Sequence, residues 1–170
     1  MHKKVLLTKT ENFLYHGEVL MPEGFEINPI EIASEIIETY ITGQKLKFCK
    51  AIDLVETYVR EHIGAYEKIY LETLDFSGKI YYSNQVTKPE LDINADFTLL
   101  YGVHVNDCTI HIIYEDNKEK LIRHIPLTNK KFILFPSKFL HYITNEQKNH
   151  HLNMVQKTNN YVQVTFYFCV

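Results

Sequence analysis

The pattern of apolar and polar positions changes near Gly64, from a helical period to an alternating one. Before this glycine, apolar residues recur every three or four positions in two stretches, which predicts two helices. Asn28 and Pro29 supply an N-cap and a first helical residue for the first helix, and Gly43 should end it. The second helix is expected from about residue 49 until Gly64 stops it. The two apolar stripes are Ile30, Ala33, Ile37, Tyr40 and Ile41, then Ile52, Val55, Val59 and Ile63.

Short alternating segments, separated by turn residues, fill most of the remaining chain and predict strands. They lie at residues 5–8, 12–20, 68–74, 79–83, 97–105, 108–114, 120–125, 132–135, 141–144, 152–156 and 161–169, with turn chemistry at residues 75–78, 116–117 and 159–160. Many short strands joined by turns indicate a sandwich or jelly roll. We therefore expect one mainly β domain with N-terminal helices (α+β) over residues 1–170. Its helices, at about 29–64, should cover one face of a β-sandwich at about 67–170.

Composition narrows the class of protein. The chain has 170 residues, of which 45% are apolar and 23% charged, so it should form a globular core. A net charge of −3 gives no electrostatic basis for binding nucleic acid. No apolar run approaches a membrane span, and Lys9 and Glu11 interrupt the short N-terminal one too early for a secretory leader. We expect a protein made in a cytoplasm.

The cysteines and several histidines have ordinary structural interpretations. Three widely spaced cysteines support neither a disulfide framework nor a zinc knuckle, and Cys108 is expected in the core. His104 and His111 alternate with apolar neighbours, so they either cap the sandwich or face its interior. The pair at residues 150–151 is expected to be exposed and incidental.

One histidine has a more specific context. His141 follows the apolar segment at residues 132–135 and a Pro-Ser turn, where a β-sandwich can present a ligand at its open end. It is either a metal ligand or a structural histidine bonded to a backbone carbonyl. An iron(II) site needs two histidines and one carboxylate on one face of the metal. Only His16 has an acidic residue two positions later, and it precedes both helices, which is the wrong position.

From about residue 30 onward the chain resembles the 2-oxoglutarate, Fe(II)-dependent oxygenase superfamily, and in particular the small oxygenase-like proteins of bacteriophages. The segment at residues 135–141 resembles the family motif F-P-S-x-x-x-H. Weaker similarities lie at residues 74–82, 97–105, 107–116 and 161–168. The resemblance implies a double-stranded β-helix with a metal and a 2-oxoglutarate site at its open end.

The family's first ligand pair, P-x-H-x-H or P-x-H-x-D, should fall in residues 87–94, where this chain has Glu90 and Asp92. The resemblance then implies a metal triad of Glu90, Asp92 and His141. With two carboxylates such a site is harder than usual, so Mn²⁺ or Mg²⁺ suits it as well as Fe²⁺. The alternative is that Glu90 and Asp92, which follow Lys88 and Pro89, belong to a solvated loop.

The family also binds the distal carboxylate of 2-oxoglutarate with an arginine on its last strand. Tyr161 stands at the matching position. Arg123 or Lys131 could replace that arginine if their side chains point inward, because a cation is needed to pair with the carboxylate.

Three functions remain open from the sequence. The first is a non-catalytic jelly roll with a degenerate site and no cofactor, which serves a phage as a virion, neck or tail component and binds protein partners or copies of itself. The second is an active dioxygenase that uses Fe(II) or Mn(II) and 2-oxoglutarate at the unusual Glu-x-Asp…His site. The third is a cupin-like module that binds a small ligand without turnover.

Overall fold

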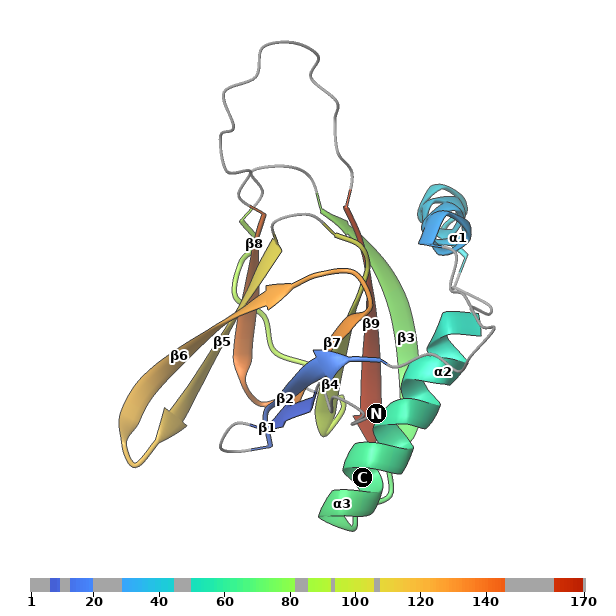
Figure 1. Ribbon diagram of the computed structural model, residues 1–170. Helices are drawn as coiled ribbons and strands as arrows, with labels where there is room; N and C mark the ends of the chain where they lie inside the picture. Colours follow the sequence, from blue (N-terminus) through green and yellow to red (C-terminus); the bar gives the residue numbers. More distant parts are fainter. Residues whose placement is uncertain are drawn as a thin grey trace, which may run out of the picture.

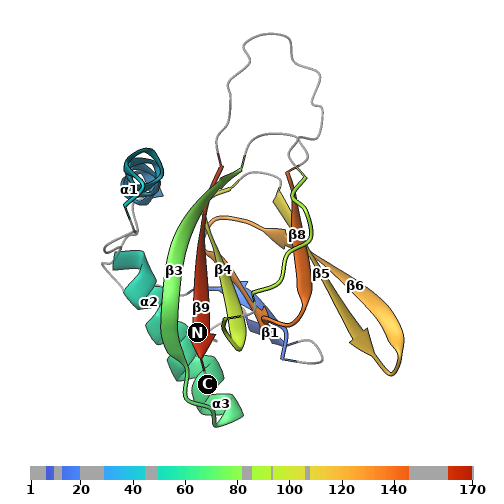
Figure 2. The same ribbon diagram turned by 180° about the vertical axis from the view of Figure 1, so that it is seen from behind.

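The computed structural model describes residues 7–9, 13–19, 29–44, 50–81, 86–92, 94–105, 108–145 and 161–169 (Figure 1). Within these residues, antiparallel strands form two sheets, and the helices lie against the outer side of the larger sheet (Figures 1 and 2). The expectation of a mainly β jelly roll with two helices on one face is confirmed. None of the described helices is long and apolar enough to cross a membrane.

The first helix has the predicted ends, but the second does not. Helix α1 (Pro29–Thr42) is followed by Gly43, which takes the left-handed conformation at φ +68°. Helix α2 (Lys50–Val59) continues through one π-helical turn, Arg60–Gly64, into α3 (Ala65–Glu67). The prediction that Gly64 stops the helix is therefore wrong, and Lys68 takes the left-handed position instead.

Gly64 has a different role, which explains the error. A Cβ at this residue would lie 3.1 Å from the carbonyl oxygen of Ile69, whose amide donates to the Gly64 carbonyl at 2.9 Å. The glycine therefore permits the chain to fold back closely over the helix end.

The larger sheet has six strands among the described residues, in the order β1-β2-β7-β4-β9-β3. One predicted turn is wrong, because β3 runs straight through residues 75–78. Gly78 lies in this strand because a side chain there would overlap Ile36 of α1. A glycine within a strand often marks such a close approach. The strands are β1 (Leu7–Lys9), β2 (Tyr15–Glu18), β3 (Glu72–Tyr81), β4 (Phe97–His104), β7 (Lys131–Pro136) and β9 (Tyr161–Cys169).

The smaller sheet has three strands in the described part of the chain, in the order β6 (Glu119–Leu127), β5 (Cys108–Asp116) and β8 (Leu140–Asn145). A tight turn joins β5 to β6 with Asn117 and Lys118 both at positive φ, one residue later than predicted. Residues 86–92 run along the free edge of β8, bridged to it at Val86 and Glu90 (Figure 2).

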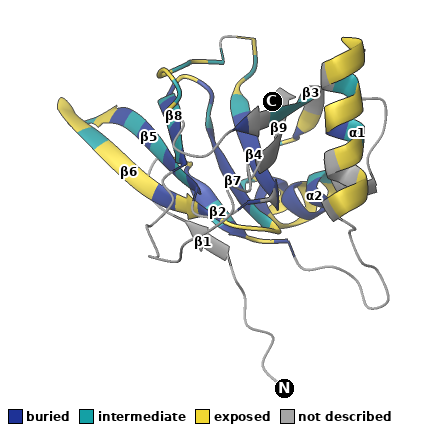
Figure 3. Ribbon diagram, turned by 90° about the horizontal axis from the view of Figure 1, so that it is seen from above, coloured by how far each residue is buried: buried dark blue, intermediate teal, exposed yellow. Residues whose placement is uncertain are grey.

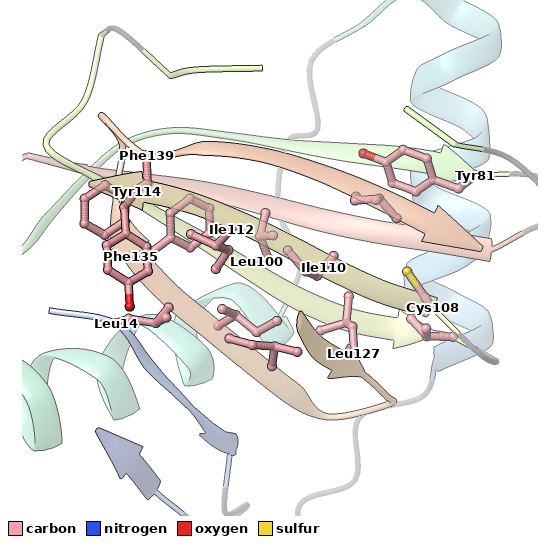
Figure 4. Packing of buried hydrophobic residues seen from close by; sticks show 14 residues of the cluster. Leu14, Tyr81, Leu100, Cys108, Ile110, Ile112, Tyr114, Leu127, Phe135 and Phe139 are labelled. Atoms are coloured by element: carbon pink, nitrogen blue, oxygen red, sulfur yellow. The ribbon is translucent and has the colours of Figure 1, made fainter. Parts of the chain in front are cut away.

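The core has two layers, and strand alternation divides the side chains between them. On β7, Phe132 and Leu134 face the helices, whereas Ile133 and Phe135 face the smaller sheet. In Figure 3 the buried, dark blue parts of the ribbon lie mainly on β4, β5, β7 and β8, and Figure 4 shows the inter-sheet cluster from close by. Cys108 belongs to this cluster, as predicted, and burial raises the pKa of its thiol to about 12. The predicted strand at residues 152–156 and the turn at 159–160 lie outside the described residues.

Candidate functional site

Glu90 and His141 lie side by side at the edge of the smaller sheet. They form an isolated antiparallel bridge, in which the Glu90 amide donates to the His141 carbonyl at 2.9 Å and the His141 amide donates to the Glu90 carbonyl at 3.0 Å. The carboxylate Oε1 of Glu90 is 3.5 Å from Nε2 of His141. Two residues that are 51 positions apart in the sequence are thus adjacent in the fold, held there by their own backbones.

A lysine from the opposite sheet completes this group. Lys79 on β3 precedes by two positions Tyr81, which belongs to the inter-sheet cluster, so strand alternation puts Lys79 on the same inner face. Its Nζ lies 2.7 Å from Oε1 of Glu90. We call Lys79, Glu90 and His141 the charged cluster. It links the larger sheet to the edge of the smaller one.

The charged cluster is partly exposed on one side and deeply buried on the other. The Glu90 side chain is 43% exposed, whereas that of His141 is 2% exposed and its ring meets Phe135 edge to face. The imidazole of His141, followed by the ammonium of Lys79, holds the pKa of Glu90 at about 2, against an ordinary 4.5 and in opposition to partial burial. Glu90 is therefore a permanent anion at neutral pH.

Within the described part of the chain, His141 uses only one of its two ring nitrogens. Nε2 faces Glu90, but the buried Nδ1 has no hydrogen-bond partner among the described residues. A metal-ligating histidine generally donates its second ring N–H to a carboxylate, a carbonyl or water, which fixes the orientation of the ring. That supporting contact is not made here by the residues that the structure describes.

Asp92 is engaged in a different network. The Thr98 hydroxyl donates to Oδ2 of Asp92 at 2.7 Å, and the Thr98 and Ser137 oxygens are 2.8 Å apart. Because Thr98 has only one hydroxyl proton, Ser137 must be the donor in the second bond. The serine of the F-P-S motif thus ties the turn after β7 to β4 and to the loop that carries Asp92.

The predicted triad is brought together only in part. Glu90 and His141 meet, but no three His, Cys, Asp or Glu side chains of the described residues are placed to hold one metal ion. The separation of Oε1 and Nε2 would suit two ligands of one ion, since each would lie about 2.0–2.2 Å from it. However, the same Oε1 is bonded to Lys79, and a facial iron site needs a third ligand. The residues that the structure describes do not fit the iron centre that the resemblance implies.

The three residues considered for 2-oxoglutarate lie on three different strands. Arg123 is exposed on β6, where its Nε donates to the Tyr114 hydroxyl at 3.1 Å. Lys131 begins β7 opposite Glu18, and burial lowers the pKa of Lys131 against the opposing effect of that carboxylate. Tyr161 begins β9, and its backbone pairs with Tyr81. Each of the two cations thus already faces a partner from a neighbouring strand.

Sequence reasoning missed Lys79 and left open a position for His111 that differs from the observed one. Lys79 lies in one of the segments that resemble the family, and its spacing of two from Tyr81 was the available signal. His111 lies between Ile110 and Ile112, both buried in the inter-sheet cluster, so it faces away from the interior. The interpretation in which His111 faces the cavity is wrong.

Similar solved structures support this description of the fold. A prolyl 4-hydroxylase from Pseudomonas putida aligns with a TM-score of 0.61 at 13% identity, over 94% of this chain and 88% of that one. AviO1 from Streptomyces viridochromogenes aligns with a TM-score of 0.60 at 9% identity, over 92% and 89%.

At such low identities the likeness concerns the fold alone. No protein-family model and no curated protein matches the sequence. The fold is that of an oxygenase-like jelly roll.

Proposed function

We propose that this protein is a non-catalytic oxygenase-like jelly roll that serves as a structural or assembly component of a bacteriophage particle. The observation that carries the proposal is the 2.7 Å contact between Lys79 and Glu90. In the charged cluster, the ammonium supplies the positive charge that a metal ion supplies in an oxygenase. The phage context rests on the sequence resemblance described above.

An ammonium and a divalent ion would compete for the same carboxylate oxygen. To bind a metal, Glu90 would have to release Lys79, whose side chain is only 31% exposed and would lose its ion-pair partner. Leaving such a charge unpaired costs free energy, because it is partly removed from water. With two protein ligands in place of three, the metal would offer little in compensation.

The residues considered for binding 2-oxoglutarate support the same proposal. Binding 2-oxoglutarate needs a cation at the distal carboxylate, and the family's position for it is Tyr161 here. Arg123 donates from its Nε to the hydroxyl of Tyr114, a buried residue of β5. The proposal therefore expects no oxidative decarboxylation of 2-oxoglutarate by this chain.

The assembly role is supported by an exposed apolar stripe on α1. Ile30, Ile37 and Ile41 are 71%, 38% and 78% exposed, while Ile36 on the other side of the helix is fully buried. Spacings of seven and four residues put the three on one face of the helix. Large apolar side chains gathered on one exposed face are typical of protein contact surfaces.

Metal and turnover measurements test the absence of catalysis. We expect anaerobic calorimetry with Fe²⁺ and with Mn²⁺ to give no stoichiometric binding to the wild-type chain, and incubation with 2-oxoglutarate to release no succinate. Lys79→Met should gain weak binding, because it frees the Glu90 carboxylate beside His141. Lys138→Met, an exposed lysine at the same end of the sandwich, is the matched control and should gain none.

The opposite results would support the hypothesis of an active oxygenase. One-to-one metal binding by the wild-type chain, lost in both Glu90→Gln and His141→Ala, would establish the Glu90, Asp92 and His141 site despite the lysine. Succinate release that depends on the same residues would establish turnover. Either result overturns the proposal.

Light scattering after size exclusion tests the assembly. We expect the wild-type chain to have a mass above its monomer value of 20.1 kDa, and Ile41→Glu to reduce it to the monomer. Val86→Glu alters another exposed apolar residue, 63% accessible on a different surface, and should leave the oligomer intact. A wild-type chain that is monomeric at all concentrations would contradict self-assembly.

A further inference from the structure

Two histidines face each other on the outer surface of the smaller sheet. His111 on β5 and His124 on β6 are directly opposed in the antiparallel register, and their Nδ1 atoms are 2.6 Å apart. The rings meet edge to face at a centroid distance of 4.8 Å. This pair lies on the opposite face of the sheet from His141, which is buried, so it is separate from the charged cluster.

The ring of His111 is held in one orientation. Its Nε2 lies 2.8 Å from the Thr144 hydroxyl oxygen, and its plane stacks on Tyr142 with an interplanar angle of 6°. When His111 carries its proton on Nε2 and donates it to Thr144, the unshared pair on its Nδ1 points at His124. The close Nδ1–Nδ1 contact then requires that His124 donates its own Nδ1 proton.

We propose that His111 and His124 form a binding site for a divalent transition-metal ion of the Zn²⁺ or Cu²⁺ class, with both Nδ1 atoms as ligands. Imidazole nitrogen suits these ions. The bond from the far nitrogen of His111 to Thr144 is the support that metal-ligating histidines generally have. In this tautomer, the proton between the two rings occupies the position that the metal would take.

Only a small movement of the two histidine rings would let both Nδ1 atoms bind one metal ion. Two nitrogens each about 2.0–2.1 Å from a tetrahedral ion lie about 3.3 Å apart, compared with 2.6 Å here. His124 can supply this displacement because it is exposed and belongs to the edge strand β6. It would change tautomer, moving its proton from Nδ1 to Nε2, so that no net proton is released from neutral rings. Water completes the coordination.

The test uses the full chain, freed of metal with a chelator, and Zn²⁺ as the probe. We expect one-to-one binding by calorimetry, weakened at least tenfold (about 1.4 kcal/mol) in His124→Gln. Thr144→Val should weaken binding less, since it removes only the orienting hydrogen bond. His62→Gln, which alters an exposed histidine on the helical side, is the matched control and should leave affinity unchanged.

A second probe identifies the ligands. Electron paramagnetic resonance of the Cu²⁺ complex should show two imidazole nitrogens in the wild-type chain and fewer in His124→Gln. The double variant H150A/H151A should retain both. The inference is overturned if His124→Gln binds as tightly as wild type, or if H150A/H151A loses the binding. Circular dichroism of each variant ensures that a loss of affinity is not a loss of folding.

Discussion

Gly102→Ala is expected to lower the free energy of unfolding by about 3 kcal/mol, the upper end of the range for overpacked cores. A Cβ at this residue would overlap the carbonyl oxygen of Thr128 and lie 3.0 Å from its carbonyl carbon. These are backbone atoms, which cannot rotate away as a side chain can. The Gly102 carbonyl also accepts from the Lys130 amide at 2.8 Å, so a shift of either segment breaks this bond.

Thermal unfolding provides the measurement. A loss of about 3 kcal/mol should lower the melting temperature by about 6–12 °C in a chain of this size. Gly43→Ala is the matched control, because Gly43 has a positive φ but open space around it. It should cost only the left-handed strain of about 1 kcal/mol. Equal melting temperatures for the two variants would contradict the close packing of β4 on the connection between β6 and β7.

Acid is expected to remove a stabilising contribution that depends on Glu90. The pKa of Glu90 is about 2 in the folded chain and 4.5 ordinarily, so the folded state favours the anion. The contribution is therefore complete above about pH 4.5 and is lost as the pH falls toward about 2. The full shift would correspond to about 3 kcal/mol, but exposure to solvent reduces the expected value to about 1–1.5 kcal/mol.

Chemical denaturation of Glu90→Gln against wild type measures this contribution. The variant should be less stable at neutral pH, and the difference should shrink steadily below about pH 4.5. Glu61→Gln, a change at an exposed helical glutamate, is the control and should leave the pH dependence unaltered. Parallel stability curves for wild type and Glu90→Gln would show that the charged cluster does not stabilise the fold.

The fold was largely predictable because its main signals are local. Alternation along the strands and the start of α1 at Pro29 follow from side-chain periods and backbone preferences that each segment carries by itself. The wrong predictions of secondary structure concern two glycines. Gly64 and Gly78 were interpreted as a stop and a turn, but each permits a close approach by Ile69 or Ile36, contacts that exist only in the folded chain.

The candidate site was predictable to the extent that the resemblance fixed a register. It put Glu90, Asp92 and His141 in one ligand set, of which Glu90 and His141 are adjacent in the structure, whereas Asp92 accepts from Thr98. The role of Lys79 depends on how far one sheet lies from the other, which no sequence pattern encodes. His124 was missed for a similar reason, since its contact with His111 depends on the hairpin register set by the turn at Asn117 and Lys118.

The two backbone hydrogen bonds between Glu90 and His141 have a consequence for how such proteins diverge. Peptide groups, rather than side chains, keep these two positions adjacent, so replacing either residue need not move the other. Chemistry at this end of the sandwich can consequently be lost or regained through one or two substitutions while the strand framework persists. The side chains at this end of the sandwich can therefore evolve separately from the backbone that holds them.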